Sequence, residues 1–282
     1  MNPIRSIGRS AAASMIKRKR LREHMVFVIK QRHYDDLQQR VLLSDGLACP
    51  VEFEEALYSF SEVFVREEYA PALANAPLPG RWLDLGAHAG YFSLYLVWKR
   101  LQAGLTPGSG LLIDADERVA KAIATLIGIN ELSSSLSFLR GLISVPDGNG
   151  VFVQRSGMES SSERIDAQGG DRTSVKILTE AEILEALAPP YDLIKVDIEG
   201  GEFDFLTAYT ELLSHTNRLI LEWHSWHCGG GGWASIEELL GQRGFDTIFV
   251  VAGPTPVGDD RSCGVIVAQR TTTDQVRRPR TQ

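Results

Sequence analysis

The chain has 282 residues, of which 44% are hydrophobic and 23% charged, values typical of a globular protein with one large α/β domain and an extension. Its formal net charge is −7. Because residues 1–22 carry seven basic side chains and no acidic one, the rest of the chain lies near −14. An acidic body argues against a general nucleic-acid binder, whose contact surface is normally basic.

No run approaches the ~18 apolar residues of a membrane span, so the sequence predicts no span and a cytoplasmic protein. The basic N-terminus has three interpretations: a solvated helix face, which we favour, an anchor on an acidic surface, or an organellar targeting peptide. Cys49, Cys228 and Cys263 are widely spaced without a CxxC pair, which predicts a reducing compartment and no disulfide framework. The sequence carries no indication of an oligomeric state.

Residues 1–79 have a mostly helical pattern and are predicted to form an N-terminal helical extension or lid. Straight-chain residues with few helix breakers fill residues 14–43, and a turn follows at 44–50. A second helical stretch covers 51–73 and ends at the prolines between 71 and 79.

From Gly80 the pattern changes to alternating strands and helices. The expected strands are 81–86, 110–116, 136–144, 191–197, 217–223, 245–252 and 263–270. The expected helices are 91–104, 117–130, 179–187, 201–213 and 233–244, of which the third opens on a Thr-x-x-Glu capping box. A polar stretch rich in serine, glycine and charge runs from about 146 to 174.

This alternation predicts an α/β fold with a seven-stranded sheet that is mostly parallel and covered by helices on both faces. The last two strands are joined by only about ten residues, too few for a helical crossover, so they are expected to form a C-terminal antiparallel hairpin. The domain is predicted to span 80–270, and the tail 271–282 is predicted to be disordered.

Ligands of an open parallel sheet bind outside the carboxyl ends of its strands. The first strand-to-helix turn, "DLGAHAG" (84–90), is not the dinucleotide pattern G-x-G-x-x-G. Its small residues let a ligand approach the backbone. The acid at its strand end favours a cationic or hydroxyl-bearing ligand, such as the amino-acid part of S-adenosylmethionine. Asp114, which closes the second strand, is predicted to bind ribose hydroxyls, and Asp116 is predicted to cap the next helix.

Three segments resemble the FkbM family of S-adenosylmethionine-dependent methyltransferases. "WLDLGAHAGYFSLYL" (82–96) is similar to the family's D-x-G-A-N-x-G-x-x-S, and "DLIKVDIEGGEFDFL" (192–206) is close to its hallmark D-x-I-K-I-D-x-E-G-x-E. "LILEWH" (219–224) is similar to its strand ending in E-x-H, and "SEVFVREEY" (61–69) resembles the segment before its first strand. The likeness spans roughly residues 55–270, and the K-x-D-x-E-G-x-E run is its specific signal.

The resemblance implies a class I methyltransferase (Rossmann-like) fold, S-adenosylmethionine as cofactor, and methyl transfer to a hydroxyl of a small molecule such as a sugar or secondary metabolite. Two positions depart from the family: His88 replaces an asparagine, and Asp114 with its following alanine replaces a glutamate–proline pair. A family asparagine then falls at Asn130. The expected cofactor-binding residues are Asp84, Gly86, Ala87, His88, Gly90 and Asp114, with Glu62 and Tyr69 closing over the cofactor.

The fourth and fifth strands supply the predicted acceptor site. The expected catalytic residues are Asp197, Glu199, Glu222 and His224. A hydroxyl acceptor must lose its proton, and a histidine suits that task, so His224 is the candidate base. Lys195 lies in a buried strand and needs a charged partner, which Asp197, Glu199 or Glu222 could supply. Whether this ion pair takes part in catalysis or is purely structural is left open by the sequence.

Four alternatives remain open. Asp197 and Glu222 are oxygen ligands of the kind Mg²⁺ prefers, so a metal-assisted O-methyltransferase competes. Zinc on His224, His227 and Cys228 is less favoured because the spacing gives only three ligands. The basic residues 16–22 suit a nucleic-acid or protein methyltransferase, and a non-catalytic cofactor-binding scaffold is the last alternative. The loop at 226–232, with four glycines, is predicted to be a hinge over the acceptor site.

Overall fold

The computed structural model describes residues 40–53, 55–74, 76–145, 151–154, 161–163, 171–225, 232–256 and 262–270. The basic N-terminal segment, most of the predicted helix 14–43, the loop 226–231 with His227 and Cys228, and the tail 271–282 lie outside these residues. Within the described ranges, every helix is too short or too polar to cross a membrane.

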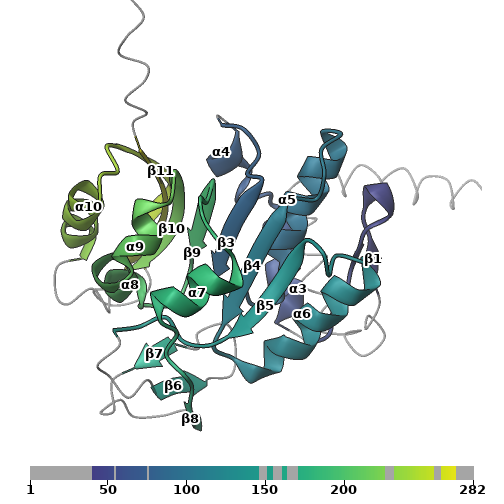
Figure 1. Ribbon diagram of the computed structural model, residues 1–282, viewed down its shortest axis with the longest axis horizontal. Helices are drawn as coiled ribbons and strands as arrows, with labels where there is room; N and C mark the ends of the chain where they lie inside the picture. The colour runs from purple at the N-terminus through teal and green to yellow at the C-terminus, as the bar shows by residue number, and fades with distance from the viewer. Residues whose placement is uncertain are drawn as a thin grey trace, which may run out of the picture.

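A seven-stranded sheet forms the centre of the fold (Figure 1). Its strands are β3 (Arg81–Leu85), β4 (Ser109–Asp114), β5 (Leu136–Arg140), β9 (Leu193–Val196), β10 (Arg218–His224), β11 (Thr247–Pro256) and β12 (Ser262–Gln269), in the order β11-β12-β10-β9-β3-β4-β5. The pairs from β10 to β5 are parallel, whereas β12 is antiparallel to both β10 and β11. The predicted sheet and its C-terminal antiparallel hairpin are therefore confirmed.

The chain changes direction in the sheet between β3 and β9. It builds β3, β4 and β5 outward, and then returns to pair β9 with the other side of β3. The crevice at the carboxyl ends of two such strands is where open α/β sheets bind ligands. The glycine turn after β3 and the Asp197–Glu202 turn after β9 therefore meet at this place.

Helices cover both faces of the sheet, and the side chains of β3 alternate between them. Trp82 packs with α5 (Tyr91–Gln102) and α6 (Glu117–Ile129), whereas Leu83 and Leu85 pack on the opposite face. That second face is covered by α7 (Glu180–Ala186), α8 (Glu202–Ala208), α9 (Thr210–Ser214) and α10 (Gly232–Gln242). The predicted capping box is present, since the side chain of Thr179 and that of Glu182 each bond the other's backbone N–H.

The described part of the N-terminal extension packs into the same core as α5 and α6. Its elements are β1 (Val41–Leu42), η2 (Ser44–Gly46), β2 (Ala48–Cys49), α3 (Ala56–Phe60), η3 (Ser61–Val65) and α4 (Ala70–Leu73). The helix predicted to reach residue 43 is wrong at 41–42, because these residues pair with 48–49 across a turn that uses Gly46 at φ 78°. The predicted helix 51–73 is interrupted at Glu67, whose φ is 52°.

Two further elements differ from the prediction. The polar stretch contains a three-stranded sheet of β6 (Val151–Gln154), β7 (Ser161–Glu163) and β8 (Asp171–Ser174), which lies below the large sheet in Figure 1. The predicted helix 201–213 is split into α8 and α9 at Tyr209, whose ψ of 59° is not helical.

Candidate active site

The turn after β3 is built around a close approach of two backbones. Gly86 has a φ of 74°, and a Cβ on it would lie 2.7 Å from the carbonyl carbon of Asp197 and overlap its oxygen. Ile113 holds the turn, because its carbonyl accepts the N–H groups of Gly86 and Ala87 at 2.9 and 3.0 Å. Gly90 has a φ of 77° and is the N-cap residue that precedes α5. The predicted glycine turn is therefore present, and at Gly86 only a residue without a side chain fits.

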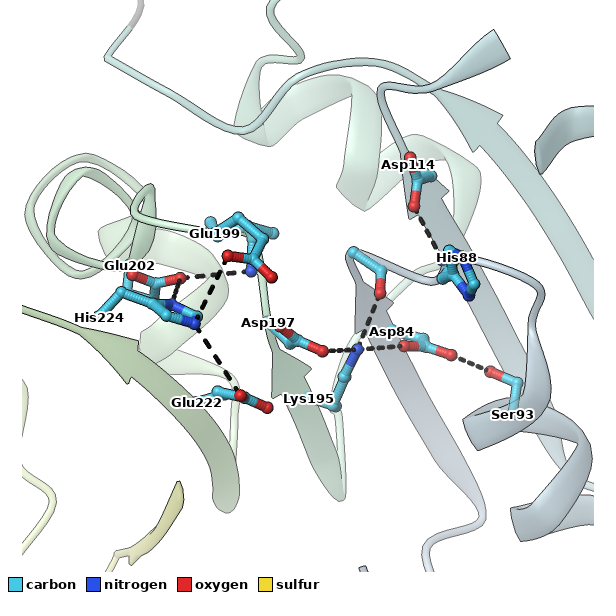
Figure 2. Close-up of polar contacts among 12 residues, drawn as sticks. Asp84, His88, Ser93, Asp114, Lys195, Asp197, Glu199, Glu202, Glu222 and His224 are labelled. Carbon is cyan, nitrogen blue, oxygen red and sulfur yellow. Dashed lines mark hydrogen bonds and ion pairs between the residues drawn. The ribbon is translucent and has the colours of Figure 1, made fainter. Parts of the chain in front are cut away.

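Lys195 ties β3 and β9 together beneath that turn (Figure 2). Its Nζ donates to the carbonyl of Gly86 at 2.8 Å and lies 3.0 Å from Asp197 Oδ2 and 3.6 Å from Asp84 Oδ1. Although burial alone would lower it, these carboxylates raise the pKa of Lys195. Of the partners predicted for Lys195, Asp197 is confirmed, and Asp84 is a second one that the sequence did not suggest.

Asp84 is fully buried and receives a hydrogen bond of 2.8 Å from Ser93 Oγ on α5. Burial raises the pKa of Asp84, and the charge of Lys195 and the Ser93 hydrogen bond oppose that rise. Its other oxygen, Oδ1, has no hydrogen-bond partner among the described residues. Ser93 was missed as a site residue, although it is the serine of the "DLGAHAGYFS" motif.

Asp114 and His88 lie side by side at the carboxyl end of β4. The carboxylate of Asp114 accepts the backbone N–H of His88 and that of Asp116, both at 2.8 Å. Burial raises the pKa of Asp114 to about 6. Asp116 caps α6 as predicted, by accepting the N–H of Arg118.

A cavity of about 240 Å³ opens at this edge of the sheet. It is lined by residues from the N-terminal extension, the glycine turn, α6 and the ends of β4 and β9, among them Phe53, Gly86, His88, Asp114, Val119, Asp197 and Glu199. Predicted cofactor residues from two segments, Gly86 and His88 of the glycine turn and Asp114 of β4, therefore meet in one cavity with the predicted catalytic residues Asp197 and Glu199. Asn130 lies elsewhere: its amide bonds the backbone of Ala48 and ties α6 to β2.

His224 is the last residue of β10, which extends one position beyond the predicted strand end at residue 223, and only 3% of it is exposed. Both ring nitrogens face carboxylates (Figure 2): Nδ1 lies 3.1 Å from Glu202 Oε1, and Nε2 lies 3.6 Å from Glu199 Oε2 and 3.9 Å from Glu222 Oε1. Burial alone would lower the pKa of His224, but the hydrogen bond with Glu202 and the surrounding carboxylates raise it to about 10.

Glu202 is a second site residue, beside Ser93, that sequence reasoning missed. It is fully buried at the start of α8 and also accepts the backbone N–H groups of Gly200 at 3.0 Å and Ile198 at 3.3 Å. Glu199 and Gly200 make this possible, because their φ values of 50° and 102° turn the chain back on itself. The sequence feature that could have indicated Glu202 is its position as the last acidic residue of the "DIEGGE" run.

The remaining predicted residues lie around Asp197. Burial and the charge of Asp197 raise the pKa of Glu222 well above its usual range. Tyr69 is nearly buried with its ring on Phe92, and burial and the charges of Asp197 and Glu222 raise its pKa. Burial, Glu68 and Asp197 raise the pKa of Glu62 to about 7. Glu62 and Tyr69 thus lie near Asp197, outside the lining of the 240 Å³ cavity. Trp223 is buried against Trp233.

The described residues contain no group of three or more histidine, cysteine, aspartate or glutamate side chains placed to hold a metal ion. Asp197, one of the two predicted magnesium ligands, is paired with Lys195 instead. The other, Glu222, faces His224. Two of the three zinc ligands considered, His227 and Cys228, fall outside the described ranges.

Comparisons with known proteins give the family. The model of the methyltransferase FkbM domain matches residues 84–247, which contain the glycine turn, Asp114, Lys195 and the Glu202–His224 pair. The methyltransferase sdnD of Sordaria araneosa is 26% identical over 220 residues, which cover 68% of this chain and 83% of that protein.

Among solved structures, an N-terminal domain of EvdMO1 with S-adenosylhomocysteine bound is 13% identical, with a TM-score of 0.46 and coverage of 86% of this chain and 96% of that one. A putative O-methyltransferase of Klebsiella pneumoniae is 13% identical, with a TM-score of 0.42 and coverage of 74% and 81%. The family model covers more than half of this chain and includes the whole crevice between β3 and β9. The chain therefore belongs to the FkbM family of methyltransferases.

Proposed function

We propose that this chain transfers the methyl group of S-adenosylmethionine to a hydroxyl oxygen of a small molecule, with His224 taking the hydroxyl proton. The observation that supports it most is the placement of His224. The ring is buried, fixed by Glu202, and directed at Glu199 and Glu222 next to the cavity-lining Asp197. The preference for a hydroxyl follows from the family resemblance.

The residues around the cavity fit the proposed methyl donor. Gly86 has no side chain at a point of the cavity lining where a Cβ would collide with the carbonyl of Asp197. His88 Nδ1 is a buried polar atom without a hydrogen-bond partner among the described residues. When bound, S-adenosylmethionine supplies an electrophilic methyl group on a sulfonium sulfur, which leaves as a neutral thioether. Asp197 and Glu222 favour positive charge beside the cavity, because their carboxylates raise the pKa of Lys195.

The chain's own residues orient the acceptor and take its proton. Glu202 holds Nδ1 of His224, so Nε2 is the nitrogen that faces the acceptor side, toward Glu199 and Glu222. As oxygen forms its bond to the methyl carbon, the hydroxyl proton moves to Nε2. Glu202 is a positioning residue, since it acts through His224. A cation bound beside Asp197 and Glu222 lowers the pKa of His224. It does so because it offsets the negative charge of Asp197, one of the carboxylates that raise this pKa.

A labelled-methyl screen tests this function. The full chain is incubated with methyl-labelled S-adenosylmethionine and a panel of sugars and other small alcohols, and the products are identified by mass spectrometry. We expect a methyl ether. A methylated nitrogen or carbon would contradict the hydroxyl assignment, and failure of the protein to bind S-adenosylmethionine in calorimetry would contradict the function.

The pH dependence of Glu202→Gln tests the role of the pair. The neutral form of His224 is the base, so kcat/KM is expected to rise with pH toward the pKa of His224, which lies at about 10 in the structure. Glutamine removes the charge that raises this pKa, so the midpoint should move to lower pH by at least about one unit. Glu185→Gln on the exposed side of α7 is the matched control. An unshifted midpoint in Glu202→Gln would remove Glu202 from this role.

Removal of metal should leave the rate unchanged. Asp197 Oδ2 lies 3.0 Å from Lys195 Nζ and Glu222 faces the His224 ring, so both predicted magnesium ligands already have a cationic partner. We expect the same kcat after dialysis against a chelator and after Mg²⁺ is added back. Loss of activity that Mg²⁺ restores would favour the metal-assisted alternative over the histidine base.

A further inference from the structure

Glu199 connects the cavity with the ring of His224. It lines the cavity beside Asp197, and its Oε2 lies 3.6 Å from Nε2 of His224 (Figure 2). The side chain of Glu199 is 28% exposed, whereas that of His224 is 4% exposed and outside the cavity lining. A hydroxyl group at the β9 end of the cavity therefore meets the carboxylate of Glu199 before it can reach the imidazole.

The two neighbouring carboxylates do not combine these properties. Asp197 also lines the cavity, but its Oδ2 is held by the ammonium group of Lys195 at 3.0 Å, and a proton arriving there would compete with that cation. Glu222 faces Nε2 of His224 at 3.9 Å but lies outside the cavity lining. Glu199 has both access to the cavity and the ring nitrogen as a neighbour.

The backbone of Glu199 adopts a conformation that favours glycine. Its φ is 50°, in the left-handed region, where a residue with a Cβ is strained. A glycine at this position would make the same turn without the strain, and residues held in this way are frequent at active sites. The turn itself therefore does not explain why a carboxylate stands at position 199.

We propose that Glu199 is a catalytic residue that takes the proton of the acceptor hydroxyl and passes it to Nε2 of His224. The inference rests on the proposed function, because it takes the acceptor atom to be a hydroxyl oxygen. As this oxygen forms its bond to the methyl carbon, the carbon–sulfur bond breaks and the sulfur keeps the electron pair of that bond.

The proton follows a path of two transfers. The hydroxyl proton moves to the carboxylate of Glu199, and from Glu199 it moves to Nε2 of the neutral imidazole. Glu199 ends the reaction as a carboxylate and His224 ends it as an imidazolium. Glu202, whose Oε1 lies 3.1 Å from Nδ1, stabilises that imidazolium by a charge-assisted hydrogen bond.

The first test removes the carboxylate and keeps the turn. Glu199→Gly suits the φ of 50°, and Glu131→Gly is the matched control, because Glu131 has a φ of 55° and lies exposed after α6, outside the cavity lining. Glycerol and D-glucose are the acceptor probes. Single-turnover transfer of labelled methyl should slow by roughly 10²–10⁴-fold in Glu199→Gly and stay within about twofold of the parent rate in Glu131→Gly.

Added formate separates a chemical role of Glu199 from a structural one. Glycine at position 199 leaves space in the cavity for a small carboxylate, so formate should raise the transfer rate of Glu199→Gly at least about tenfold, whereas chloride at the same concentration should not. A loss caused by altered structure would not respond to formate. Transfer by Glu199→Gly at the parent rate, or a reduced rate that formate leaves unchanged, would overturn the inference.

A second measurement needs no acceptor. At pH 7, below the pKa of His224, ¹⁵N NMR measures how fast Nε2–H exchanges its proton with water in the full chain with S-adenosylhomocysteine. Exchange should slow at least about tenfold in Glu199→Gln, which keeps the shape of the side chain but cannot carry a proton. Glu222→Gln should slow it less, because Glu222 lies outside the cavity lining. An unchanged rate in Glu199→Gln, or a larger effect in Glu222→Gln, would overturn the inference.

The outcomes for the two proposals are distinct. A protein that does not bind S-adenosylmethionine in calorimetry would contradict the proposed function. Binding of S-adenosylmethionine together with unchanged proton exchange in Glu199→Gln would overturn only the role of Glu199.

Discussion

Replacing His224 with alanine is expected to slow methyl transfer by roughly 10²–10⁴-fold while the affinity for S-adenosylhomocysteine stays within about twofold of the parent value. The loss follows from geometry. His224 is the only histidine that the described residues place among the carboxylates of β9, β10 and α8, and Nε2 is its one nitrogen not held by Glu202. The cavity lining does not include His224, so cofactor binding should be spared.

The measurement pairs single-turnover rates with calorimetry. His224→Gln is a useful companion, because it can still bond Glu202 and so keeps that buried carboxylate partnered, but it cannot take a proton. His215→Ala, an exposed histidine at the end of α9, is the matched control and should change neither quantity. Turnover of His224→Gln at the parent rate would show that the ring is not the base and that Glu202 and His224 only stabilise the fold.

The sheet could be predicted from the sequence because its signals are local. Buried strands such as "RWLDL" and "LILEW", separated by helical stretches with glycine stops, fix the element types and their order. The glycine turn and the strand-end acids follow from the same pattern, since parallel strands bring their carboxyl ends to one edge.

The hydrogen-bond partners of each acidic residue could not be predicted, because they depend on which groups the fold brings within hydrogen-bond distance. Glu202 and His224 are 22 positions apart and meet only when β10 packs beside β9 and α8. Asp114 stays a predicted ribose ligand, and the sequence did not show that its oxygens also accept two backbone N–H groups from turns on either side. Local sequence shows that an acid lies at a strand end and does not show what it bonds.

Strand β1 was missed for a related reason. Its two residues look helical in sequence, and only the pairing of Val41 with Cys49 and of Leu42 with Ala48 makes them extended. The small sheet in the polar stretch is likewise held by the pairing of β6 with β7 and β8. Its strands could not be predicted, because their sequences do not alternate apolar and polar residues.

Gly86→Ala is expected to be the most disruptive single methyl addition at the site. The variant must place an L-residue at φ 74°, which costs roughly 1–2 kcal/mol. It must also move the Cβ away from the carbonyl of Asp197, which is backbone and cannot rotate aside as a side chain would. Relief requires β3 and β9 to separate at their ends, where Asp197 N–H bonds Leu85 and Lys195 bonds the carbonyl of Gly86.

We therefore expect Gly86→Ala to lower the free energy of unfolding by roughly 2–5 kcal/mol in urea and to abolish S-adenosylhomocysteine binding. Gly104→Ala is the matched control: its φ is 71°, but nothing lies within 4 Å of the added Cβ. It shares the backbone strain without the collision, so its loss should be about 1–2 kcal/mol, with binding intact. The difference between the two variants measures the close approach of β3 and β9, and equal losses would mean that this approach does not constrain the site.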